Sequence, residues 1–318
     1  MFHRRFLWFL ASTFCVSGVS ALFPADLVSH RFIAADSSKH RTAIIDRQGK
    51  TEWEHRIGPL HDLHVLPNGH VLFQTSWTQL LEVDPKTSSV VWKYDSATSN
   101  GNAGKPVEVH AFQRLDNGDT MIAESGPARI IEVDFAGSIK HEIKLKVNKP
   151  HVHRDTRLAR KLSNGNYLVC HEGDGSVREY DQQGSVIWEF DVPLFGQQPR
   201  PGHGIDAFGN QCFSALRLDN GNTLIATGNG HGVIEITRDK QLVWQLQQND
   251  LPGIQLAWVT TLQLLPNGNL VIGNCHAGPN NPQIIEITRG SDKRVVWSVR
   301  DFDRFGDSLT NSQILAAE

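Results

Sequence analysis

One four-residue phrase recurs five times along this 318-residue chain. Each copy begins with leucine and ends with Asn-Gly, and a short apolar segment follows it. The copies occupy residues 66–69, 115–118, 162–165, 218–221 and 265–268. Asn-Gly favours the left-handed backbone that tight turns between antiparallel strands need. The turn glycines are 49, 47, 56 and 47 residues apart, so the phrase predicts a repeat architecture with a period near 48.

The segments between the turns have the composition of β-strands. In the first repeat the turn is followed by HVLFQT (70–75), LLEVD (80–84) and VVWKYD (90–95). Similar segments follow the other turns, although the second repeat has HEIKL (141–145) in place of the tryptophan-containing one. β-branched and aromatic residues bounded by Gly, Asn and Asp are typical of strands. Adding the strand that precedes each turn gives four strands per repeat, which predicts the blades of a β-propeller.

The two ends of the chain supply a sixth blade. Residues 31–57 contain three strand segments but no strand that would lie nearest the axis. TNSQIL (310–315) resembles the strands that precede the turns and has no blade of its own. We therefore expect an all-β, six-bladed propeller over about residues 29–316, closed by the C-terminal strand pairing into the N-terminal blade. Such closure leaves no large open sheet edge.

The first 21 residues have the features of a secretory signal. Arg4 and Arg5 precede an apolar run over 6–16, and small residues follow up to Ala21. The apolar run is short for a bilayer span. We expect residues 1–21 to be removed, leaving a single domain over 22–318 that is periplasmic or secreted and has no transmembrane segment. An uncleaved anchor is the alternative.

Charge and cysteine content bound the function further. The net charge is −3, so nothing indicates a nucleic-acid partner. Beyond residue 21 the cysteines are Cys170, Cys212 and Cys275, an odd number, so at least one thiol is unpaired. A chain of this length can bury a sufficient core without disulfides. Cys170 and Cys212 fall on adjacent predicted blades, where they could approach each other.

Histidines concentrate on one predicted face of the propeller. We call it the top face: it carries the long, variable connections, whereas the repeated turns lie on the opposite face. Variable loops on a fixed scaffold are where binding residues concentrate. Nine of the 15 histidines fall there: His40, His61, His110, His151, His153, His171, His203, His231 and His276.

The repeat also predicts two rings of side chains near the upper mouth of the central channel. Five residues before each turn leucine, and in the closing strand, stand His61, His110, Arg157, Phe213, Thr260 and Thr310. At the ends of the strands that follow the turns stand Thr75, Glu124, His171, Thr227 and Asn274. The predicted ligand-binding residues are His61, His110, Glu124, His153, Arg157, His171, His203, Asn274 and His276. The alternative is a water-filled channel lined by hydrogen-bonded polar groups.

The sequence does not assign a metal site. HVH (151–153) places two imidazoles on one side of an extended segment, but a transition metal would need a third ligand. The chain has no HExxH and no CxxC motif. No cofactor is identified either.

Two families share the repeat phrases. LLEVDPKTSSVVWKYD (80–95) resembles the tryptophan-docking repeat of quinoprotein β-propellers. HDLHVLPNGH (61–70) and LPNGNLVI (265–272) are similar to phrases of bacterial arylsulfotransferases, whose catalytic domain is a six-bladed propeller. Quinoprotein dehydrogenases have eight blades and adjacent cysteines, whereas this chain has six repeats and no adjacent pair. The second resemblance implies a channel histidine that carries a sulfuryl group.

These observations predict an exported propeller that binds a small-molecule, glycan or protein ligand on its top face. The alternative is an arylsulfotransferase-like enzyme with His110 or His61 as nucleophile. Arg157 would then stabilise developing negative charge, and Glu124 would orient an imidazole. The sequence leaves open whether the protein is an enzyme.

Overall fold

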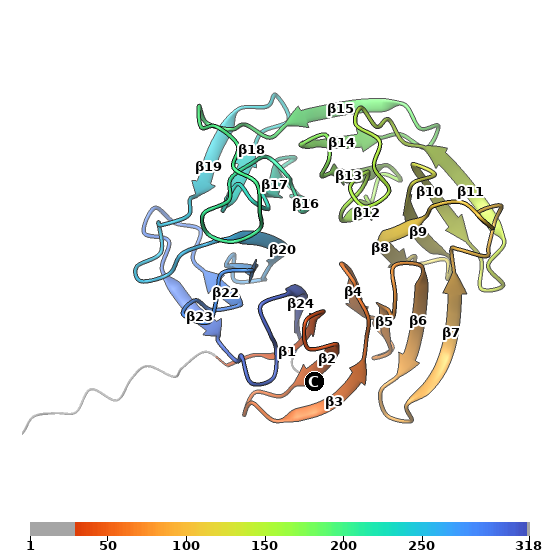
Figure 1. Ribbon diagram of the computed structural model, residues 1–318, viewed down its shortest axis with the longest axis horizontal. Helices are drawn as coiled ribbons and strands as arrows, with labels where there is room; N and C mark the ends of the chain where they lie inside the picture. Colours follow the sequence, from red (N-terminus) through yellow and green to blue (C-terminus); the bar gives the residue numbers. More distant parts are fainter. Residues whose placement is uncertain (1–28, 317–318) are drawn as a thin grey trace, which may run out of the picture.

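Six sheets form a closed ring in the computed structural model, which describes residues 29–316. Each sheet has four antiparallel strands, and the sheets stand as blades around a central axis (Figure 1). The predicted six-bladed all-β propeller is therefore confirmed. Residues 29–316 include no helix long and apolar enough to cross a bilayer. The expected signal segment, 1–21, lies outside the described residues.

The blades are numbered from the N-terminus and their strands are given from the axis outward. Blade one contains β24 (Leu309–Leu315), β1 (Arg31–Asp36), β2 (Arg41–Ile45) and β3 (Thr51–Arg56). Blade two contains β4 (Leu63–Val65), β5 (Val71–Gln74), β6 (Gln79–Asp84) and β7 (Ser89–Asp95). Blade three contains β8 (Glu108–Arg114), β9 (Thr120–Ser125), β10 (Arg129–Val133) and β11 (Ile139–Lys144).

The remaining strands follow the same order. Blade four contains β12 (Ala159–Lys161), β13 (Tyr167–His171), β14 (Ser176–Tyr180) and β15 (Val186–Asp191). Blade five contains β16 (Ser214–Arg217), β17 (Thr223–Ala226), β18 (Val233–Ile236) and β19 (Leu242–Leu246). Blade six contains β20 (Trp258–Leu264), β21 (Leu270–Cys275), β22 (Ile284–Ile287) and β23 (Val295–Val299).

The seam in blade one joins the two ends of the described chain. Strand β24 pairs antiparallel with β1, with Ile33 opposite Gln313, and Figure 1 shows the dark blue strand beside the red one. Leu309 and Ile314 are buried in an apolar cluster shared with blade six. This pairing confirms the predicted closure by residues 310–315.

The repeated phrase forms the same turn in blades two to six. In the first copy the Gly69 amide donates to the Leu66 carbonyl, and the Asn68 side chain accepts from the His70 amide at 3.0 Å. The glycine at the end of each copy has φ between 83° and 88°. A side chain is strained in that left-handed region, which explains why glycine is used each time.

The core is divided among the interfaces between neighbouring blades. Six buried apolar clusters lie within residues 29–316, one at each interface. Two outer-strand tryptophans add a polar link: Trp92 Nε1 donates to the Phe135 carbonyl at 3.0 Å, and Trp188 Nε1 to the Arg238 carbonyl at 2.9 Å. Each acceptor lies in the next blade. The three cysteines beyond residue 21 are free and buried, and Cys170 and Cys212 share one cluster.

Candidate functional site

His110 owes its position to an irregularity in β8. The pairing of β8 with β9 shifts register between Val109 and Ala111, so His110 is the extra residue of a β-bulge. Bulges redirect a side chain, and they are common beside functional sites. The His110 side chain is fully buried near the axis. The repeat therefore positions the strand, and the bulge aims the imidazole.

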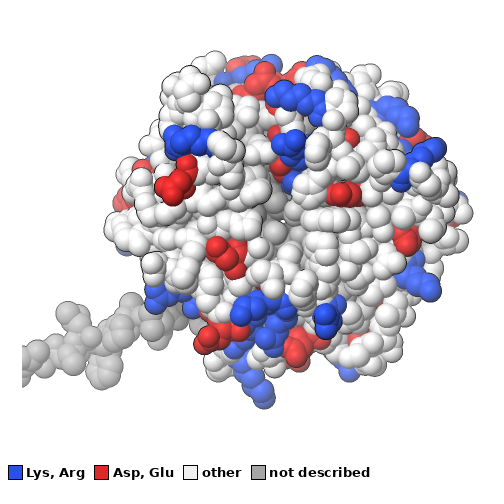
Figure 2. Space-filling view, in the orientation of Figure 1, with Lys and Arg blue, Asp and Glu red and all other residues white. Residues whose placement is uncertain are grey.

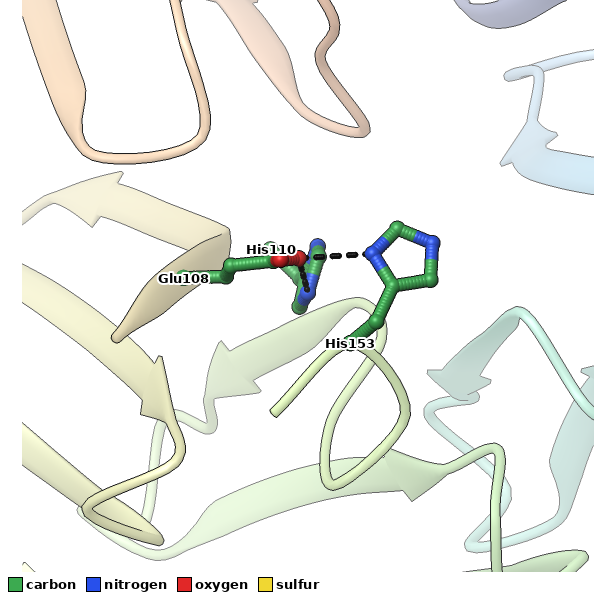
Figure 3. Close-up of side chains that lie close together, drawn as sticks. All are labelled: Glu108, His110 and His153. Carbon is green, nitrogen blue, oxygen red and sulfur yellow. Dashed lines mark hydrogen bonds and ion pairs between the residues drawn. The ribbon is translucent and has the colours of Figure 1, made fainter. Parts of the chain in front are cut away.

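Glu108, His110 and His153 form a compact cluster, which we call the EHH cluster (Figure 3). Their candidate ligand atoms all lie within 4.8 Å of one another. Glu108 Oε2 is 2.6 Å from His153 Nδ1 and 3.2 Å from His110 Nε2. Glu108 and His110 come from β8, whereas His153 comes from the loop before β12. Figure 3 shows the carboxylate between the two imidazoles.

A third imidazole, that of His61, extends the cluster. His61 Nδ1 and His110 Nδ1 are 2.7 Å apart, so one donates a hydrogen bond and the other accepts it. The Trp77 ring packs against all three histidines, with centroid distances of 4.8 Å to His61, 5.2 Å to His110 and 5.0 Å to His153. The indole thus covers the imidazoles and fixes their orientation.

Burial controls the charge of these groups. It lowers the pKa of His110 to about 3, with the charges of Arg157 and His153 acting in the same direction. It also lowers the pKa of His61 well below its ordinary value. Burial raises the pKa of Glu108, but the neighbouring His110 and His153 outweigh this effect and lower it to about 2. At neutral pH the site therefore holds neutral imidazoles at His61 and His110 and an ionised carboxylate.

Arg157 links the EHH cluster to blade four. Its guanidinium is buried, forms an ion pair with Glu172, and donates to the carbonyl oxygens of His153 and Thr156. It thereby holds the loop that carries His153. The predicted neighbours His61, His110 and Arg157 do lie together, and His153 joins them.

Beside the cluster a cavity of about 720 Å³ opens between the loops of blades four and five. Four cationic side chains line it, together with three histidines and a single carboxylate, Glu172. In Figure 2 the centre of this face is hollowed, and Lys and Arg atoms border the hollow. The charged and histidine side chains of the lining are Lys149, His151, His153, Arg154, Arg157, Glu172, Arg200 and His203.

Three other predicted top-face histidines, His171, His203 and His276, lie in two different environments. The His203 ring lies 5.3 Å from that of His276 and 4.7 Å from that of Trp258, at the edge of the cavity. His171 is elsewhere: its Nδ1 donates to the Asp155 carbonyl at 2.7 Å, and its Nε2 accepts from the Tyr180 hydroxyl at 2.8 Å. Both ring nitrogens of His171 are thus occupied by the protein itself.

Two further predicted residues, Glu124 and Asn274, also use their polar atoms in hydrogen bonds within the propeller. Glu124 is buried and accepts from Arg129 at 2.6 Å and from Asn102 at 3.0 Å, so it does not orient an imidazole. Asn274 is buried, and its side chain bonds to the backbone of residues 255, 257 and 282. The residues of the second predicted ring therefore do not line the cavity together.

The HVH segment is not extended, contrary to the expectation from sequence. Its backbone turns, because the amides of Arg154 and Asp155 both donate to the His151 carbonyl. His151 is exposed on the cavity side, while His153 points to Glu108. The two imidazoles do not form a pair of ligands.

The repeated pattern does not predict some residues of the site. Trp77 lies in a top loop, and Arg154 and Arg200 lie in variable connections. Glu108 stands two residues before His110, but the bulge at His110 breaks the alternation from which a shared face could be predicted. The conformation of the top loops decides the rest.

Comparisons with known proteins agree with the fold. A search of curated proteins found no match. A solved structure from Bacteroides caccae, described as a protein of unknown function, is 23% identical with a TM-score of 0.73, covering 90% of this chain and 98% of that one. Virginiamycin B lyase from Staphylococcus aureus is 14% identical with a TM-score of 0.53, covering 86% and 84%. At these identities the likeness shows the fold alone.

A family model gives a finer classification. The model described as outer membrane protein assembly factor BamB matches residues 16–94 and 44–299. The second match spans more than half of the chain and contains all five turn phrases. Together with the six-bladed ring, it identifies this protein as a member of that PQQ-like β-propeller family.

Proposed function

We propose that this propeller binds an anionic ligand in the basic cavity of its top face. The supporting observation is the charge of the lining: four cationic side chains face one carboxylate, an excess of three positive charges. The chain as a whole carries −3, so the cavity reverses the overall sign. Clustered charge of one sign in a concave site attracts ligands of the opposite sign.

Three of the four cationic groups that line the cavity are available to a ligand. Glu172 already pairs with Arg157. Lys149, Arg154 and Arg200 have no carboxylate partner among residues 29–316. Ligand sites for small molecules have volumes of roughly 300–1,000 Å³, and this cavity lies within that range at about 720 Å³. We therefore assign a small molecule with carboxylate, sulfate or phosphate groups, or such a group on a larger partner.

The role we propose is binding rather than catalysis. The description of the matched family as an assembly factor supports this choice. We place this binding in the periplasm or outside the cell, in line with the predicted signal segment.

Calorimetric titration with chosen anions tests the proposal. The purified protein is titrated with 4-nitrophenyl sulfate, a sugar phosphate, citrate and a neutral trisaccharide. We expect only the anions to bind, and with an affinity that falls as salt rises. The double substitution Arg154→Ala with Arg200→Ala removes two exposed cavity cations, whereas Lys86→Ala with Lys93→Ala removes the same charge from exposed positions outside it. Equal binding by the two double variants would refute the assignment.

The close spacing of Glu108, His110 and His61 supports one second candidate, group transfer by His61. If His110 directs its Nε2–H at Glu108, its Nδ1 accepts from His61 Nδ1–H, and His61 Nε2 keeps a lone pair. That lone pair would attack a sulfuryl sulfur, forming an N–S bond as the phenolate leaves with the S–O electron pair. His110 is less suited as nucleophile, because it is fully buried.

Transfer from 4-nitrophenyl sulfate to a phenol tests this candidate. Wild type should release nitrophenolate and gain the mass of one sulfuryl group, and His61→Ala should do neither. Absence of turnover in the wild type across several donors and acceptors would exclude it.

A further inference from the structure

The EHH cluster has the donor set of a divalent transition-metal site. Two imidazole nitrogens and one carboxylate oxygen are the protein ligands of many zinc sites, which keep a fourth position for water or substrate. Sequence alone could not reach this set, because the turn at 151–153 separates His151 from His153. The structure instead brings Glu108 and His110 to His153.

We propose that Glu108, His110 and His153 bind one zinc-like divalent cation at the edge of the basic cavity. The inference does not depend on the proposed anion binding, although a metal here would share the cavity with the basic side chains. The ligand atoms would be Glu108 Oε2, His110 Nε2 and His153 Nδ1.

Distances between the donor atoms suit such a cation. With bonds of about 2.0–2.1 Å in a tetrahedral arrangement, two ligand atoms lie roughly 3.3 Å apart. The Glu108–His110 distance of 3.2 Å matches this value, and the Glu108–His153 distance of 2.6 Å requires a small opening. The Glu108 and His153 side chains are 18% and 37% exposed, so they are free enough to provide it.

An independent observation concerns His110 Nε2. This atom is buried and makes no well-aligned hydrogen bond, although Glu108 is close. A buried polar atom without a partner is costly, and a bound cation would remove that cost.

His61 completes the site as the outer partner of His110. Metal-bound histidines commonly donate their other ring N–H to a neighbouring acceptor, which fixes the tautomer. Here His110 Nδ1–H would donate to His61 Nδ1. His61 Nε2 then carries a proton and is not a nucleophile. Metal binding and the group-transfer candidate therefore require opposite tautomers.

Direct metal binding is the test. The full chain is treated with EDTA, and ZnCl₂, CoCl₂ and NiCl₂ are titrated calorimetrically in the absence of added anions. We expect one ion per chain, visible absorption from bound Co²⁺, and ¹⁵N shifts that show His110 bound through Nε2 with its proton on Nδ1. Glu108→Gln and His153→Ala should each weaken binding by more than the roughly 10- to 100-fold that loss of an outer-shell partner costs.

His40→Asn is the control, since it removes an exposed histidine of blade one that lies outside the cavity lining, at a left-handed position that asparagine tolerates. It should bind the metal like wild type. Thermal melts of the metal-free variants show whether each remains folded, since Glu108→Gln and His153→Ala also change the 2.6 Å contact between these two side chains. The assignment is overturned if no ion binds stoichiometrically, or if Glu108→Gln and His153→Ala bind as well as wild type. Anion titrations on EDTA-treated protein are separate, so failure of one proposal leaves the other testable.

Discussion

Asp62 makes hydrogen bonds to three other blades, and its removal should weaken the whole ring. The residue lies just before β4 in blade two and is fully buried. Its carboxylate accepts from the Phe112 amide of blade three at 3.1 Å and from Arg160 of blade four at 2.7 and 2.9 Å. It also accepts from Asn311 of the closing strand at 3.3 Å. One carboxylate thus connects four of the six blades.

The contribution of Asp62 to the free energy of unfolding follows from its pKa. Burial raises the pKa of Asp62, but Arg160 and His64 outweigh that effect and lower it to about 2, against an ordinary value of 3.8. A tenfold change in an acid dissociation constant corresponds to about 1.4 kcal/mol, so the ionised form contributes about 2 kcal/mol to folding at neutral pH. Because the pKa in the folded state is depressed, this contribution is complete above about pH 4 and disappears as the pH falls toward 2.

Asp62→Asn should therefore lower the free energy of unfolding by about 2–4 kcal/mol at pH 7, including the cost of leaving Arg160 without its partner. Urea unfolding followed by tryptophan fluorescence measures this, with Asp116→Asn in an exposed turn as control. The difference in the free energy of unfolding between wild type and Asp62→Asn should decrease as the pH falls from 4 to 2. Equal unfolding midpoints for the two variants at pH 7, or a difference that does not change with pH, would refute the reasoning.

Four further outcomes follow from the structure. Deleting residues 309–318 should abolish cooperative unfolding, because β1 loses its partner and the cluster with Ile314 opens; a truncated chain that melts like the full one would contradict this. His171 alone should contribute about 3 kcal/mol to the loss of stability between pH 6.5 and pH 4, because burial lowers its pKa in the folded protein to about 4 and the unfolded chain binds the proton first. A His171→Gln variant with the same acid dependence as wild type would count against this. Trp188→Phe should cost about 1 kcal/mol through its lost hydrogen bond, whereas Trp244→Phe should cost less because Trp244 Nε1 has no acceptor within residues 29–316; thermal melts compare the two. The mature protein should begin at Leu22, and N-terminal sequencing of protein from whole cells that finds only chains beginning at Met1 would favour the uncleaved anchor.

The fold could be predicted because its determinants are local. Each turn glycine needs a left-handed backbone, and each strand keeps its apolar composition, so the period is visible without knowledge of distant contacts. The closing strand could be predicted for a related reason. Residues 310–315 have the pattern of an inner strand, and only blade one lacked such a strand.

The site was only partly predictable, because repeat position fixes where a strand begins but not where its side chain points. His61 and His110 occupy equivalent positions in adjacent blades, and they are in contact as the repeat suggests. Glu124 and His171 also occupy equivalent positions, yet Arg129 and Tyr180 take up their polar atoms. Those partners come from other strands, and a one-residue bulge at His110 is invisible in a period of 48.

The pairing of β24 with β1 has a consequence for the order in which the protein is made. Blades two to six each consist of four consecutive strands, so each can form once its own segment has been synthesised. Blade one is begun first and completed last, because β1 can pair with β24 only after residues 309–315 have been synthesised. At translation rates of roughly 5–20 residues per second, this interval lasts roughly 15–60 seconds. Throughout it, β1 presents unpaired amide and carbonyl groups that a strand of a second copy could occupy.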